Sequence, residues 1–170
     1  MRNIARLIFG NAQIYERVYR ILNAAGGNDP SLLLPGNVNA ALSLELYFKS
    51  LNILEHGVEF KINGKHSHHF AQLFQQLKEP TKIQLSEKFK IAISNVDPNE
   101  IARLEWMLGG VVPKDLKTNL VEWSTIFTDL RYAHSFIEKY KGKKVAMAFY
   151  PQIVDSVCTV IIDREPTWKT

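Results

Sequence analysis

The sequence has only one cysteine and no long uninterrupted run of apolar residues. Cys158 cannot form an intramolecular disulfide or a zinc site of several cysteines, so we expect a reducing environment and a buried, unreactive thiol. No apolar run reaches the ~18 residues that a membrane-spanning helix requires. Arginines interrupt the apolar residues near the N-terminus, which argues against a signal peptide. The sequence therefore predicts a cytoplasmic protein that does not enter a membrane.

Several familiar catalytic and nucleotide-binding motifs are also missing. The chain contains no GxxxxGK(S/T) phosphate loop, no GxGxxG, no HExxH and no GxSxG. These absences remove the sequence support for P-loop, dinucleotide-binding, metalloprotease and α/β-hydrolase chemistry. We expect neither a cofactor nor a metal.

The excess of positive charge is small. The 170 residues include 21 lysines and arginines against 17 aspartates and glutamates, and the net charge of +4 permits a polyanionic partner without requiring one. Hydrophobic residues make up 46% of the chain, which is enough for a single domain to bury a core. We expect one bundle domain over residues 1–162 and a flexible C-terminal tail over 163–170, in which Trp168 either pins the tail or reaches a partner.

Apolar residues recur at helical spacing along most of the chain, with an extended connector expected at 58–62. The predicted helices are 2–24 (loosened at Gly10), 38–56 (after a loop containing Pro35 and Gly36), Ser67 or His68 to Leu77, 81–95, a short helix from Asp97-Pro98 to Gly109-Gly110, 115–140 and 145–162. The segment 115–140 has the most regular pattern, so we expect it to be the central helix. The sequence predicts an all-α antiparallel bundle of about six or seven helices.

Two polar residues interrupt the apolar stripe of the longest predicted helix. His134 occupies a position where Leu or Phe would continue the stripe, and Arg131 lies one turn earlier on the same side. A buried arginine needs a carboxylate, and Glu45 at the border of the apolar face of the second helix offers one. We therefore predict a polar centre in which Glu45 approaches Arg131, with Tyr132 and His134 nearby and His68 at the edge.

Three further sets of polar residues each allow two interpretations. Glu45 also belongs to a stripe that would suit a solvated helix face, formed with Lys49, Asn52 and His56. Three histidines suggest a metal site, although their spacing is wrong for one helix face and favours a helix cap and an exposed residue: His66, His68 and His69. Lysines form two groups that either contact phosphates or only increase solubility: Lys139, Lys141, Lys143 and Lys144, and Lys78, Lys82, Lys88 and Lys90.

Three segments together resemble the HEPN superfamily of small all-α bundles. They are residues 41–51 (ALSLELYFKSL), residues 68–77 (HHFAQLFQQL) and Leu130-Arg131-Tyr132 in the longest predicted helix. The resemblance implies a homodimer whose arginine-bearing helices meet near the symmetry axis. It also implies RNA or a nucleotide as a ligand and a protein partner such as an antitoxin, because many members work in toxin–antitoxin, defence or stress systems.

The ribonuclease members of that superfamily carry an arginine followed, after four to six residues, by a histidine. In this chain only two residues separate Arg131 from His134, and no other arginine is followed by histidine at the family spacing. We therefore expect a non-catalytic module that binds RNA, a nucleotide or a protein. The alternative is a metal-independent endoribonuclease in which Arg131 stabilises the phosphorane and His134 acts as general base.

Overall fold

The computed structural model describes residues 1–59, 61–62, 65–124 and 147–168. Its elements are α1 (Arg2–Gly26), η1 (Pro30–Leu32), α2 (Leu33–His56), β1 (Lys61–Ile62), β2 (Lys65–His66), α3 (Phe70–Gln75), α4 (Glu79–Ser94), α5 (Pro98–Leu108), α6 (Leu116–Trp123), α9 (Tyr150–Arg164) and η2 (Pro166–Trp168), where η marks a 3-10 helix. These residues contain seven α-helices, which confirms the predicted all-α bundle. None of the described helices combines the length and apolar character needed to cross a bilayer.

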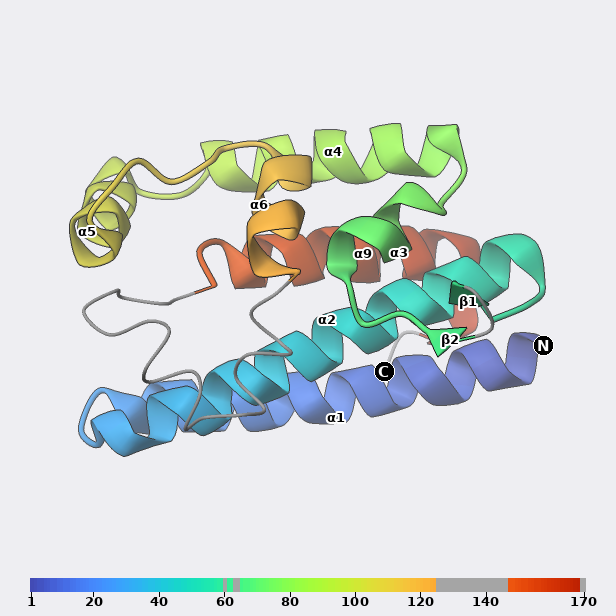
Figure 1. Cartoon of the computed structure of the whole chain (residues 1–170), viewed down its shortest axis with the longest axis horizontal. Helices are drawn as coiled ribbons and strands as arrows, with labels where there is room; N and C mark the ends of the chain where they lie inside the picture. Colours follow the sequence, from blue (N-terminus) through green and yellow to red (C-terminus); the bar gives the residue numbers. More distant parts are fainter. Residues whose placement is uncertain (60, 63–64, 125–146, 169–170) are drawn as a thin grey trace.

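Helices α1 and α2 form a long antiparallel pair along one edge of the molecule (Figure 1). The predicted first helix is confirmed, but the expected loosening at Gly10 is wrong, since α1 runs through it. Helix α2 begins at Leu33 instead of residue 38, because Pro35 lies in the first turn, where the missing proline N–H has no helical partner to lose. Gly57 ends α2 in the left-handed conformation, with φ of 69°.

Helix α9 lies at the centre of the described bundle, between the α1–α2 pair and α4 (Figure 1). Its residues Ile153, Val157 and Val160 are completely buried. The central position predicted for 115–140 is therefore occupied by α9 among the described helices. Burial of β-branched side chains between helices contributes about 1.5–3 kcal/mol each, which outweighs their weaker helix propensity.

The continuous helix predicted over 115–140 is wrong at Ser124. Helix α6 ends one residue before Ser124, whose hydroxyl donates a hydrogen bond to the Leu120 carbonyl oxygen at 2.6 Å and accepts one from the Ala71 backbone N–H at 2.9 Å. These bonds tie the end of α6 to the start of α3 and compete with continuation of the helix. The rest of the predicted helix, from residue 125 on, lies outside the described residues.

Local capping signals explain the shorter elements. Asp97 accepts a hydrogen bond from the Asn99 backbone N–H at 2.8 Å and begins α5 as predicted, and Gly109 ends it with φ of 73°. The connector after α2 forms a small antiparallel ladder, in which Lys61 in β1 pairs with His66 in β2.

The C-terminal segment is packed as far as Trp168. Helix α9 extends beyond the predicted boundary at residue 162, and the Arg2 guanidinium binds the Glu165 carboxylate. The Trp168 ring is 5% exposed and lies 5.7 Å from the Phe9 ring, measured between centroids. Of the two roles considered for Trp168, the structure therefore shows that this residue anchors the C-terminal segment to the core. The flexible tail expected from residue 163 is not found as far as Trp168.

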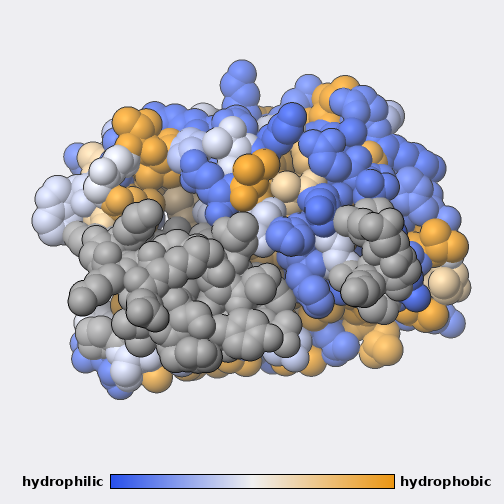
Figure 2. Space-filling model, in the orientation of Figure 1, coloured by the Kyte–Doolittle hydropathy of each residue, from blue (hydrophilic) through white to orange (hydrophobic). Residues whose placement is uncertain are grey.

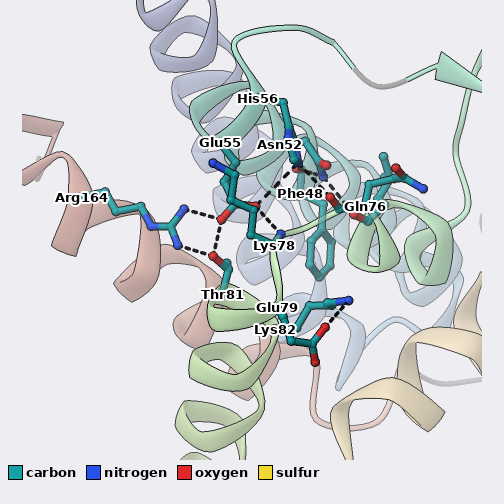
Figure 3. A network of polar contacts seen from close by, with 11 residues as sticks. Phe48, Asn52, Glu55, His56, Gln76, Lys78, Glu79, Thr81, Lys82 and Arg164 are labelled. Atoms are coloured by element: carbon teal, nitrogen blue, oxygen red, sulfur yellow. Dashed lines mark hydrogen bonds and ion pairs between the residues drawn. The ribbon is translucent and has the colours of Figure 1, made fainter.

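A buried carboxylate joins three helices at the C-terminal end of α9 (Figure 3). Glu55 at the end of α2 accepts hydrogen bonds from the Lys78 backbone N–H at 2.8 Å, the Thr81 hydroxyl of α4 and the Arg164 guanidinium of α9 at 2.8 Å. Arg164 also donates to the Thr81 hydroxyl oxygen. The arrangement fixes the ends of α2, α4 and α9 relative to one another.

Candidate functional site

The predicted polar centre is built around Glu45, which is only 4% exposed in the middle of α2. Its Oε1 lies 2.8 Å from Lys49 Nζ, one helical turn along, and 2.9 Å from His68 Nδ1. Glutamate followed by lysine at the i+4 position pairs across one helical turn. Its Oε2 has no hydrogen-bond partner among the described residues. The structure thus brings Glu45 and His68 together and adds Lys49, a partner that the sequence argument did not assign.

The segment before α3 holds His68 in place. The Ser67 hydroxyl donates a hydrogen bond to the Gln72 side-chain oxygen at 2.7 Å and accepts one from the His69 backbone N–H at 3.2 Å. His69 occupies the N-cap position of α3 without a side-chain cap, and its side chain is exposed. Helix α3 therefore fixes the backbone of His68 through a serine, and the expectation that a histidine side chain caps this helix is wrong.

The other predicted members of the polar centre are Arg131, Tyr132 and His134, which lie outside the described residues. Their approach to Glu45, and the ribonuclease alternative that depends on two of them, stay predictions.

The alternative interpretation, that the polar stripe of α2 is solvated, is wrong for most of the stripe. Lys49 and Asn52 are buried along with Glu45, and only His56 at the end of α2 is exposed.

A groove of about 810 Å³ lies between α4, α5 and the start of α6. Its floor is apolar, with Phe89 and Ile93 from α4 and Leu116 from α6 all buried. Both helices turn these side chains toward the core because they belong to the apolar stripes of α4 and α6. The groove sits within the range of about 300–1,000 Å³ that is typical of small-molecule sites.

The rim of this groove is positively charged. Lys90, Lys114 and Lys117 are exposed at its edge, and within the described part of the chain none of them has an ion-pair partner. One carboxylate is present, but Asp115 accepts a hydrogen bond from the Thr118 backbone N–H at 2.8 Å as the N-cap of α6. The rim therefore favours an anion over the apolar floor.

The lysine groups identified in the sequence are rearranged by the fold. Of the group around α4, Lys82 pairs with Glu79 at 2.7 Å and Lys88 with Asp163 at 3.2 Å, so that only Lys90 faces the groove without such a partner. The second group lies outside the described residues. Lys114 and Lys117 come from the loop before α6 and from α6 itself, and no run of lysines in the sequence marks them.

A second hollow of about 490 Å³ adjoins the groove along α4. The two share Ser86 and Lys117, so together they extend the concave surface from α5 toward α3. Lys82 and Glu79 line the second hollow, which is therefore more balanced in charge. The shape suits an elongated ligand whose charge is concentrated near Lys117.

The only cysteine belongs to a buried polar cluster between α1, α2 and α9. The Tyr47 hydroxyl donates a hydrogen bond to Glu16 at 2.6 Å, and burial raises the pKa of Tyr47 above its usual range. Burial also raises the pKa of the neighbouring Cys158 thiol to about 12, although the Tyr47 hydroxyl partly offsets the rise. Cys158 is therefore a neutral thiol at physiological pH.

Alkylation of native Cys158 by iodoacetamide at pH 8 is expected to be at least about a hundredfold slower than alkylation of the unfolded chain, because thiolate is the reactive form. Mass spectrometry of timed aliquots, with and without guanidinium chloride, measures both rates on the same residue. Equal rates in the two conditions would show that the thiol is exposed or ionised in the folded protein.

Among the residues that the structure describes, no group of three histidine, cysteine, aspartate or glutamate side chains is placed to hold a metal ion. The candidate sites are therefore the Glu45–Lys49–His68 cluster and the lysine-rimmed groove. Comparison of the chain with family models, with curated proteins and with solved structures finds no match.

Proposed function

We propose that this chain is a non-catalytic, HEPN-like module that binds RNA or a nucleotide in the groove between α4, α5 and α6. The observation that carries the proposal is the combination of an apolar floor with three exposed lysines that have no described ion-pair partner. A nucleotide has the matching chemistry, since its base is flat and largely apolar on its faces and its phosphates are anionic.

The positions of the lysines favour contact with phosphates over base recognition. A lysine ammonium acts as a point charge that neutralises phosphate oxygens, and it reads no base sequence. Lys117 lines both the groove and the adjoining hollow, so a ligand that spans the two would contact it in either one. Val96 and Ile101 also line the groove and are only half-buried, so they offer the apolar surface against which a base can rest. We therefore expect binding with little sequence preference and a strong dependence on salt.

Replacing Lys117 by Glu is expected to weaken binding of a labelled single-stranded RNA of about ten nucleotides by about tenfold at low salt. The loss of one phosphate contact should also make the slope of log K against log salt shallower by about 1. Fluorescence anisotropy measures both quantities, and unlabelled mononucleotides added as competitors test whether a single nucleotide fills the site.

The control is Lys61→Glu, which reverses one exposed charge on β1, away from the groove, and changes the net charge by the same amount. It should alter the affinity less than about twofold. Equal losses in Lys61→Glu and Lys117→Glu would mean that net charge alone attracts RNA, and absence of binding by the wild type at low salt would contradict the proposal.

A further inference from the structure

Helix α1 carries apolar residues on two nearly opposite sides. One side enters the core through Ala5, Phe9 and Ala12. The other side is exposed to solvent, where Leu7 is 66% and Ile14 is 59% accessible. Helix α1 forms the lower edge of the molecule in Figure 1, and hydrophobic atoms appear along that edge in Figure 2. Single exposed apolar residues are common, but a stripe along one helix marks an interaction surface.

The outward side of α1 follows a heptad repeat. Steps of three and four residues alternate without a break along one stripe: Ile4, Leu7, Asn11, Ile14, Val18, Ile21 and Ala25. From Ile4 to Ala25 the stripe spans three heptads, or about six turns of the 25-residue helix. Asn11 is its one polar member, at a position equivalent to Ile4 and Val18. A single asparagine at such a position specifies the register and a two-stranded state, since two facing amides donate to and accept from each other.

The charges of α1 are compatible with a second copy of the same helix. Arg2 and Arg20 bind Glu165 and Glu16 of their own chain. Arg17 flanks the stripe, and in a parallel pair the heptad geometry places it beside Leu22 of the second copy, where its aliphatic stem can pack. No arginine then faces another arginine across the seam. An identical helix in parallel register therefore satisfies both the apolar stripe and its charged border.

We propose that the protein forms a homodimer in which the outward faces of two α1 helices pair in parallel, with Asn11 opposite Asn11. The interface lies on the side of α1 opposite the core, so both bundles keep their fold and both grooves stay open. The proposal is independent of the nucleotide-binding function. It also differs from the dimer implied by the family resemblance, in which the helices that carry Arg131 meet.

The test is sedimentation equilibrium of the full chain, with the wild type expected at twice the chain mass of 19.4 kDa. Ile14→Glu places a charge in the seam and is expected to sediment at the mass of one chain. The matched control is Ile91→Glu, the same substitution at a 63% exposed isoleucine of α4, and it should remain dimeric. Circular dichroism checks that each variant keeps its helical content.

A second variant tests the parallel register directly. Leu7→Cys places two thiols opposite each other in a parallel pair, whereas in the antiparallel heptad register Leu7 faces Val18. Mild oxidation should therefore yield a disulfide-linked dimer of Leu7→Cys but none of the wild type, whose Cys158 is half-buried. A monomeric wild type, which would leave the stripe to another protein's helix, overturns the proposal. A dimer unaffected by Ile14→Glu, or no disulfide with Leu7→Cys, also overturns it.

Discussion

Replacing Lys49 by Met is expected to lower the free energy of unfolding by about 3–5 kcal/mol at neutral pH, or about 6–20 °C in Tm. The Lys49 and Glu45 side chains are only 11% and 5% exposed, and Nζ lies 2.8 Å from Oε1. Without the ammonium, the carboxylate stays in the core without its cation. Methionine retains most of the apolar stem, so the loss reports the missing charge more than missing packing. Denaturant unfolding followed by circular dichroism measures it.

Two variants separate this effect from the loss of any surface lysine. Lys88→Met removes the partner of Asp163, but those side chains are 30% and 49% exposed, so we expect a change within about 1 kcal/mol. The double variant Glu45→Gln/Lys49→Met removes both charges and should recover most of the stability. If Lys49→Met lowered the free energy of unfolding no more than Lys88→Met does, the Glu45–Lys49 ion pair would have to be hydrated in solution.

The sequence placed Glu45 in the predicted polar centre and His68 at its edge, but it did not assign Lys49 to the same cluster. Spacing along α2 placed Glu45, Lys49 and Asn52 on one stripe, which fits a solvated face as well as a buried one. The difference depends on how many neighbours cover the helix. Helix α2 is covered by α1, α3 and α9, so even its polar stripe is buried. A helical repeat shows which residues share a side, but not what packs against that side.

Helix ends were predictable where a local signal sets them. Asp97 and Gly109 bound α5 through hydrogen bonds and backbone conformations within a few residues of the chain. The end of α6 was not predictable in this way, since the Ser124 hydroxyl is engaged by the Ala71 backbone N–H of a different helix. Periodicity continues past that point in the sequence, and only a tertiary contact marks the break.

The groove could not be predicted from the sequence either, because it too depends on tertiary contacts. Lysines were grouped by nearness along the chain, whereas the groove combines Lys90 from α4 with Lys114 and Lys117 from the region of α6. Nothing in the spacing of these residues indicates that they converge. Their convergence depends on how α4, α5 and α6 are placed relative to one another.

Replacing Glu55 by Gln is expected to lower the free energy of unfolding by about 1.5–3 kcal/mol at neutral pH, because the hydrogen bonds in Figure 3 lose the carboxylate charge and the ion pair with Arg164 is broken. The Glu55 side chain is 2% exposed, and it accepts from Lys78, Thr81 and Arg164. The control is Glu79→Gln in the same region, where the side chain is 72% exposed and pairs with Lys82 at the surface. That change should stay within about 1 kcal/mol.

The effect of Glu55→Gln should depend on pH with a definite sign. Burial favours the neutral carboxyl, but the hydrogen bonds from Thr81, the Lys78 backbone and Arg164 outweigh it and lower the pKa of Glu55 from its usual 4.5. A carboxyl whose pKa is lower in the folded state stabilises the fold fully above the unfolded pKa and loses that contribution as the pH falls through the folded pKa. The difference in unfolding free energy between wild type and Glu55→Gln should therefore be fully present at about pH 5 and shrink below about pH 4.5. A difference that persists unchanged to pH 2 would mean that the carboxylate charge is not what holds α2, α4 and α9 together.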